Sequence, residues 1–166
     1  MQPLTETDIR ASFVNSTKGE AKRLVLPKDL ADQPWHDLDF LGWRDPAAPQ
    51  RAYVVTSVGG SATGVALRLA DSSTGQRRRN MCAVCLTTHS GDGVSLMTAR
   101  KAGRSGQQGN SVGTYLCSDL ACSAYVRGLR SAGPGARLQE SLSVEDLVER
   151  MMGRLRAFID SVTRDT

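Results

Sequence analysis

Four cysteines, arranged as two pairs, constrain the fold of this chain more than any other feature. They are its only cysteines, and they lie between residues 82 and 122 as Cys82-x2-Cys85 and Cys117-x4-Cys122. Zinc takes four ligands at tetrahedral corners, and a tight turn with two cysteines supplies half of that set without backbone strain. The spacing therefore predicts a structural zinc site with Cys82, Cys85, Cys117 and Cys122 as its ligands.

The segment around the second pair, TYLCSDLACSAYVRGL, changes from an extended pattern to a helical one. One ligand then precedes a helix and the other lies in its first turns, as in a treble-clef zinc finger, which we place at about residues 80–131. Two disulfides or four unrelated buried thiols are the alternatives. The polar, acidic start MQPLTETDIR is unlike a signal peptide, which favours a reducing cytoplasm and hence zinc.

His89 follows Cys85 closely enough to replace one cysteine in the ligand set. Four cysteines already complete a structural site, so we expect His89 to remain outside it. A closed set also leaves no position for a water molecule, which a catalytic zinc requires. No nucleophile, base and orienting group accompany the metal in the sequence, so we predict no enzymatic activity and no small-molecule substrate.

Charge is concentrated in one part of the chain, although the net charge is only +4. Between residues 76 and 110 a single acid, Asp92, stands against six basic residues, namely Arg77, Arg78, Arg79, Arg100, Lys101 and Arg104. Some of them would balance the negative charge of a zinc ion held by four thiolates. The alternatives for the rest are an ordinary solvated face or, as we favour, a docking surface for an acidic protein or phosphates.

The remaining patterns predict one α+β domain over residues 1–166, with an antiparallel β-sheet between N- and C-terminal helices. No apolar run approaches the roughly 20 residues of a membrane span. The aromatic and proline residues between Pro34 and Pro46 are typical of a core plug. The Gly-rich stretch 100–113 is expected to be a mobile basic loop. The expected elements are a short helix at 5–16, a β-hairpin region at 51–70, a second hairpin from 94–99 and 114–117, and a helix at about 143–163.

The last helix carries an apolar stripe that includes Leu155, Phe158 and Ile159. Such a stripe ordinarily packs on the sheet. The alternative is that its last turns project and offer Phe158 to a partner.

Several strings together resemble the C-terminal treble-clef domain of elongation-factor-G-binding proteins, among them the FusB-type fusidic acid resistance proteins. They are LDFLGWRDP, MCAVC, GVSLMTARK and GTYLCSDLAC, in this order. The resemblance covers nearly the whole chain, although the FusB-type proteins have a larger helical N-terminal domain. It implies a zinc-stabilised α/β domain that binds elongation factor G and speeds its release from the ribosome, notably when fusidic acid has stalled it.

The same resemblance implies the site residues. Cys82, Cys85, Cys117 and Cys122 would hold the zinc, and Met81, Tyr115 and Phe158 would match the surface that binds the factor. Met81 stands where the FusB-type proteins have an aromatic residue. They also have a basic residue shortly before the tyrosine, which Arg100, Lys101 and Arg104 would replace. The alternative function is a zinc-containing protein that contacts ribosomal RNA through the basic segment and acts without the factor.

Overall fold

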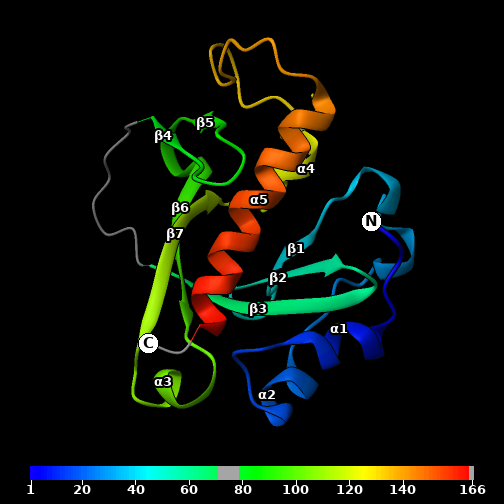
Figure 1. Cartoon of the computed structure of the whole chain (residues 1–166), viewed down its shortest axis with the longest axis vertical. Coiled ribbons are helices and arrows are strands. Elements are labelled where there is room, and N and C mark those ends of the chain that lie inside the picture. Colours follow the sequence, from blue (N-terminus) through cyan, green and yellow to red (C-terminus); the bar gives the residue numbers. More distant parts are fainter. Residues whose placement is uncertain (71–78, 165–166) are drawn as a thin grey trace.

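The computed structural model describes residues 1–70 and 79–164, in which one mixed sheet-and-helix body carries a long C-terminal helix (Figure 1). Predicted residues Arg77 and Arg78 lie outside the described part. The helices are α1 (Glu6–Ser12), α2 (Lys18–Arg23), α3 (Gly103–Gln107), α4 (Cys122–Val126) and α5 (Val144–Thr163), with 3-10 turns at Leu30–Asp32, Trp35–Asp37 and Gly91–Gly93. The strands are β1 (Leu41–Arg44), β2 (Arg51–Val58), β3 (Ser61–Leu69), β4 (Asn80–Met81), β5 (Thr88–His89), β6 (Val94–Arg100) and β7 (Ser111–Cys117).

Five strands form one antiparallel sheet in the order β1-β2-β3-β6-β7, and β4 pairs with β5 in a small separate ribbon. Both predicted hairpins are present. Gly59 and Gly60 join β2 to β3 with positive φ angles, which a two-residue hairpin turn requires. The β6–β7 hairpin runs from the Val94↔Cys117 pair at one end to the Arg100↔Ser111 pair at the other.

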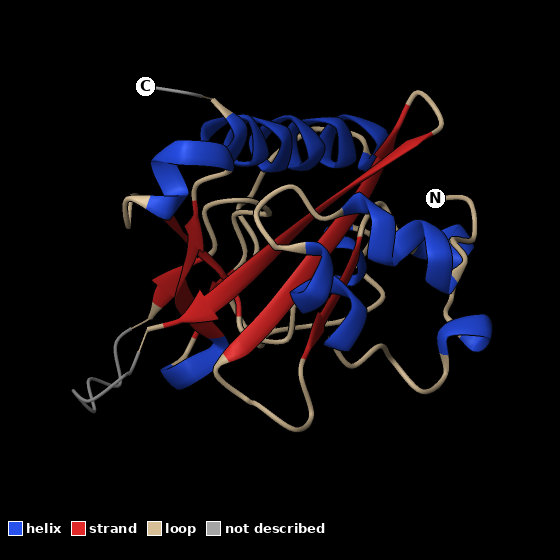
Figure 2. Ribbon diagram, turned by 90° about the horizontal axis from the view of Figure 1, so that it is seen from below, coloured by secondary structure: helices blue, strands red, loops and turns tan. Residues whose placement is uncertain are grey.

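Alternate residues of the sheet face two different apolar clusters. Ala52 and Val54 of β2 belong to the cluster that contains α5 and the cysteines. Tyr53 and Val55 of the same strand belong to the cluster beneath α1 and α2. This period-two alternation lets one sheet bury both faces, and Figure 2 shows helices on both sides of the strands.

The N-terminal helix was predicted at 5–16, but in the structure it ends earlier, at Ser12. Its start is as predicted, with Thr5 and Asp8 forming a capping box. We did not predict α2, since Gly19 disfavours a helix, yet Thr17 and Glu20 form a second capping box there.

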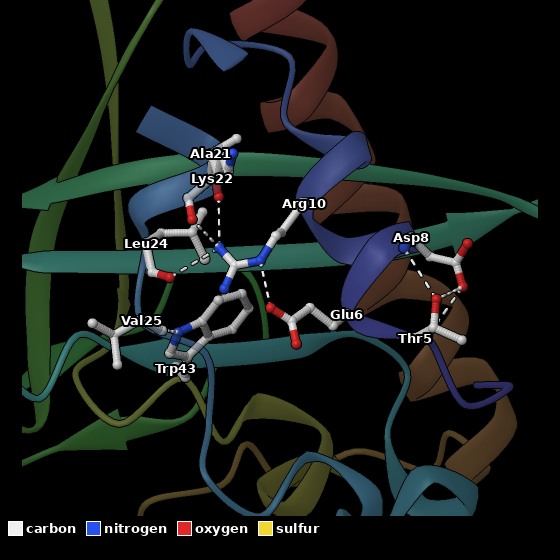
Figure 3. A network of polar contacts seen from close by, with 9 residues as sticks. All are labelled: Thr5, Glu6, Asp8, Arg10, Ala21, Lys22, Leu24, Val25 and Trp43. Atoms are coloured by element: carbon white, nitrogen blue, oxygen red, sulfur yellow. Dashed lines mark hydrogen bonds and ion pairs between the residues drawn. The ribbon is translucent and has the colours of Figure 1, made fainter. Parts of the chain in front are cut away.

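Arg10 holds these two helices together. Its Nη1 donates to the carbonyl oxygens of Ala21, Lys22 and Leu24 at 2.8, 2.9 and 3.1 Å, and its Nε donates to Glu6 at 2.7 Å. The guanidinium therefore satisfies carbonyls at the C-terminal end of α2 that would otherwise lack donors. Figure 3 shows this network beside Trp43, whose indole N–H donates to Val25.

The aromatic segment forms core, as predicted, and also contains a strand that the sequence did not reveal. Trp35, Phe40 and Trp43 are all buried, and β1 runs through the middle of the segment. Gly42 of β1 lies against the second cysteine pair, because a Cβ added there would stand 2.7 Å from the Cβ of Leu120. The Gly-Trp element thus joins the sheet to the finger through a close approach that only glycine permits.

The expectation of a loosely structured loop at 100–113 is wrong. Residues 103–107 form α3, in which Ser105 and Gly106 are buried, and the strands on either side continue to Arg100 and from Ser111. The backbone N–H of Ala102 donates to Val162 at 2.8 Å, so this segment covers the end of α5. The prediction failed because glycine is common in loops but also allows the backbone to pack closely against its neighbours.

The C-terminal helix begins as predicted, with Ser143 and Asp146 in a capping box. Met151, Leu155, Ile159 and Val162 are buried on one side of it, and they pack on the cluster that holds the cysteines. Across the described residues, no helix has the length and apolar character that crossing a bilayer demands.

Candidate metal centre

The first cysteine pair sits on a tight turn between β4 and β5. Cys82 donates its backbone N–H to Thr87 and accepts from the N–H of Leu86, and the N–H of Cys85 points at the Cys82 sulfur at 3.4 Å. Leu86 adopts a left-handed φ of 61°. Such a turn brings two sulfurs to one side and lets backbone N–H groups stabilise their negative charge.

The second pair joins a strand to a helix. Cys117 is the last residue of β7 and Cys122 is the first residue of α4. Between them Leu120 has a φ of 57° and donates its N–H to the Cys117 carbonyl. One ligand before the helix and one in its first turn is the arrangement that the sequence predicted.

The two pairs converge on one point. All four cysteines are buried, and their sulfurs lie within 4.8 Å of one another. The Sγ atoms of Cys82 and Cys122 are 3.8 Å apart, and those of Cys85 and Cys117 are 3.4 Å apart. A tetrahedral zinc with sulfurs at about 2.3 Å sets them about 3.8 Å apart, whereas a disulfide requires about 2.05 Å. The geometry fits a metal ion and not the disulfide alternative.

The four thiols hold their protons unequally. Hydrogen bonds from the thiols of Cys117 and Cys122 lower the pKa of Cys82 and of Cys85, whereas the pKa values of Cys117 and Cys122 are raised. Because the deprotonated thiol is the form that binds metal, a cation at the centre would favour that form in all four. Because four thiolates and zinc carry a formal charge of −2, neighbouring hydrogen-bond donors stabilise the loaded site.

His89 is such a neighbour. Its Nε2 lies 3.3 Å from the sulfur of Cys117, and its buried ring packs edge-on against Tyr125. Gly93 makes room for it, because a Cβ there would collide with the His89 side chain. The sulfurs that surround the metal position belong to the four cysteines, so His89 is placed to donate to a ligand.

We expect His89→Gln to lower zinc affinity by roughly tenfold to a hundredfold, because the thiolate loses its donor. Competition with a chromogenic chelator measures this affinity. His36→Gln is the matched control, since His36 is exposed and pairs with its neighbour Asp37. Equal affinities of the two variants would show that His89 does not support the metal.

Two of the predicted partner-binding residues stand at the zinc centre with their side chains in solvent. Tyr115 is 51% exposed and Met81 is 43% exposed. The backbone N–H of Ala83, inside the Cys82 turn, donates to the carbonyl of Tyr115 at 2.8 Å. This bond ties β7 to the turn, so both side chains project from backbone that the cysteines hold.

Arg154 of α5 supports the same turn, and sequence analysis missed it. Its Nη1 donates to the carbonyl of Ala83 at 3.2 Å. A single arginine on the polar side of a helix gives no local signal of such a role.

The other predicted residues lie elsewhere. Phe158 is half-buried and packs against the core, so it does not project as the alternative reading of α5 required. Arg100, Lys101 and Arg104 lie at the far end of the β6–β7 hairpin, about 20 Å along the strands from Cys117. Arg100 pairs with Glu20 at 3.4 Å, and Lys101 donates to the carbonyl of Arg164. The zinc centre and these basic residues are therefore two separate surfaces.

Fold and cysteine site together define a zinc-binding α+β protein with a treble-clef finger. Residues 8–162 match the family described as FBP C-terminal treble-clef zinc-finger, and the chain belongs to that family. No curated protein matches it. Among solved structures it is similar to the fusidic acid resistance protein FusC, at 15% identity and a TM-score of 0.54 over 87% of this chain and 54% of FusC. The chain thus spans about half the length of that protein, and the likeness shows a shared fold.

Proposed function

We propose that this chain binds translation elongation factor G in the cytoplasm and promotes its release from the ribosome. The observation that carries the proposal is the pair of exposed apolar side chains, Tyr115 and Met81, on backbone fixed by the zinc centre. A large side chain held rigidly in solvent loses little conformational entropy on binding, and aromatic residues of this kind dominate protein interfaces. Family membership supplies the class of partner, since the family is that of the FusB-type proteins.

Zinc acts structurally in this proposal. With the four cysteines as ligands the coordination shell is complete, so the metal has no position for a substrate or an activated water molecule. Its contribution is to fix the turn after Met81 and the end of β7. The chain then works as a binding protein and not as an enzyme.

Protection against fusidic acid is the finer part of the proposal. It rests on the family and on the fold shared with FusC, which is a fusidic acid resistance protein. If this chain frees the factor from drug-stalled ribosomes, its addition restores translation in an extract inhibited by fusidic acid. Arg100, Lys101 and Arg104 would form a second, separate contact at the far end of the β6–β7 hairpin, and Phe158 would contribute the exposed part of its ring.

We expect Tyr115→Ala to weaken binding to elongation factor G at least about tenfold, because it removes the largest exposed apolar anchor at the zinc centre. The fold should persist, since the ring is half in solvent. Leu129→Ala is the matched control, because Leu129 is 61% exposed but lies beyond α4. Calorimetric titration gives both affinities. Unchanged affinity of the Tyr115 variant would remove this residue from the interface.

A further inference from the structure

A hollow lined by arginines lies beside the finger, and the segment that follows α4 forms it. It has a volume of about 320 Å³, and its wall includes Arg130, Arg137, Gly128, Gly133 and Gly135. Among the described residues that line it there is no aspartate or glutamate. Arg79, which directly precedes β4, contacts the same loop by donating to the carbonyl of Pro134 at 3.0 Å. We call the surface formed by Arg79, Arg130, Arg137 and the loop 128–136 the arginine hollow.

Each guanidinium in the arginine hollow is oriented by contacts with neighbouring described residues. Arg137 donates to the carbonyl of Val126 at 3.1 Å. Arg130 lies 3.1 Å from a carboxylate oxygen of Asp119 and 6.0 Å above the ring of Tyr125. A guanidinium has five N–H donors, so a single hydrogen bond or ion pair leaves most of them for a ligand.

Two carboxylates lie beside the arginine hollow. Asp119 pairs with Arg130 and also accepts a hydrogen bond from Tyr125 at 2.8 Å. Glu140 interacts electrostatically with Arg137, but both of its oxygens bind Arg150, at 2.5 and 2.7 Å. Four arginines, Arg79, Arg130, Arg137 and Arg150, thus stand against the two carboxylates, which leaves a local net charge of +2 (4 − 2).

The glycines leave the arginines uncovered. Gly128, Gly133 and Gly135 have φ angles of 72°, 103° and 68°, which disfavour any other residue. Among the described residues, a Cβ at Gly128 would meet Arg137 at 3.3 Å and a Cβ at Gly135 would meet Arg79 at 3.6 Å. Two guanidinium groups thus lie beside glycine backbone that carries no side chain.

We propose that the arginine hollow binds phosphate groups of an RNA backbone. An arginine can donate two parallel hydrogen bonds to two oxygens of one phosphate. The three arginines of the hollow, Arg79, Arg130 and Arg137, therefore suit a ligand with several phosphates. No leucine, isoleucine, valine, methionine or phenylalanine lines the hollow, so the hollow itself offers a protein partner none of the apolar anchors that dominate protein interfaces. Its one aromatic residue, Tyr125, is only 6% exposed, so bases have no ring to stack on. The contact is therefore with phosphates and independent of base sequence.

The arginine hollow contains neither Tyr115 nor Met81, but it adjoins them, because Thr88, which pairs with Met81, donates its N–H to Ala136 of the loop at 2.8 Å. It also differs from the basic segment that the sequence suggested for RNA, with which it shares only Arg79. The chain would hold its protein partner at the zinc centre and an RNA phosphate backbone in the arginine hollow.

The test is fluorescence anisotropy of labelled oligouridine at low salt, with Arg130→Gln/Arg137→Gln compared with the wild-type protein. We expect the double variant to bind at least about tenfold more weakly, and the slope of log K against log salt to become shallower by about 1.4, since each lost single-strand phosphate contact removes about 0.7. Arg44→Gln/Arg68→Gln is the matched control, because it removes the same charge from exposed positions of the sheet. Its affinity should remain near that of the wild type.

Each other outcome would overturn the proposal. Equal losses in the two double variants would show that only net charge matters, and absence of RNA binding by the wild type would exclude the site. A double variant that lost affinity for elongation factor G instead of RNA would make the hollow a protein contact. Zinc content and thermal unfolding establish that the variant folds. Arg130→Gln alone, at a side chain that is 56% exposed, repeats the test with little risk to the fold.

Discussion

Replacing Cys82 with serine should remove the zinc and unfold the finger together with the core around it. Serine is a poor zinc ligand, and three remaining thiolates would be buried without their cation. Cys82 is fully buried and belongs to the same apolar cluster as Leu116, Met151 and Leu155, so loss of the metal also exposes the contact surface of α5. We expect a loss of more than about 4 kcal/mol in the free energy of unfolding, in the range that removal of a structural metal produces.

Metal analysis and thermal unfolding of the purified variant measure this effect. Treatment of the wild-type protein with a strong chelator should produce the same unfolded finger, and added zinc should restore it. Ser90→Ala is a suitable control, because Ser90 is exposed beside β5 and is not a ligand. A Cys82→Ser protein with native melting and full zinc content would show that this cysteine does not hold the metal.

Gly106→Ala should be the most damaging conservative change outside the zinc centre. An added Cβ would overlap the carbonyl oxygen of Lys101 and stand 3.0 Å from the Cγ of Arg100. Backbone cannot yield as a flexible side chain does, so α3 must move away from β6, and the bond from Ala102 to Val162 at the end of α5 would be strained. We expect a loss of about 2–4 kcal/mol in the free energy of unfolding.

Gly113→Ala is the matched control, since it lies in the same hairpin. Its Cβ would meet the Leu96 and Thr98 side chains at 3.3 and 3.4 Å, which a small rotation of either side chain relieves. Denaturant unfolding of both variants measures the difference. Equal stabilities would mean that α3 is not packed as the structure describes.

Local chemistry made much of this fold predictable. The cysteine spacings, the Gly59-Gly60 turn and the Ser143 capping box each act through residues a few positions apart, and each appears in the structure. The periodic apolar stripe of α5 likewise faces the core. Local patterns of this kind predict the structure correctly because the tertiary contacts stabilise the same local conformations.

Features that depend on distant contacts were not predictable. Strand β1 is hidden in an aromatic segment, and its pairing with β2 depends on residues beyond it in the chain. The β3–β6 pairing, Arg68↔Thr98 and Leu69↔Met97, joins the two hairpins and has no local signal. Short α2 and α3 contain glycine, so their stability comes from Arg10 and from packing, not from helix propensity.

The residues of the candidate site likewise differ in whether the sequence predicts them. The cysteine ligands are recognisable from their spacing, and His89 lies close to them in the sequence. Arg154, in contrast, reaches the finger from α5, whose placement the sequence does not specify. Tyr115 and Met81 were inferred from the family resemblance, and their exposure at the zinc centre supports the proposed interface. Counting charges along the chain grouped Arg79 with Arg100, Lys101 and Arg104. In three dimensions Arg79 joins Arg130 and Arg137.

Calorimetric titration of the zinc-loaded protein with elongation factor G from its own host, at low and moderate salt, tests the proposed function most directly. We expect saturable binding that survives moderate salt, because salt screens interactions between charges and not the contacts of apolar anchors at the zinc centre. Absence of binding by a protein with full zinc content and native melting would contradict it.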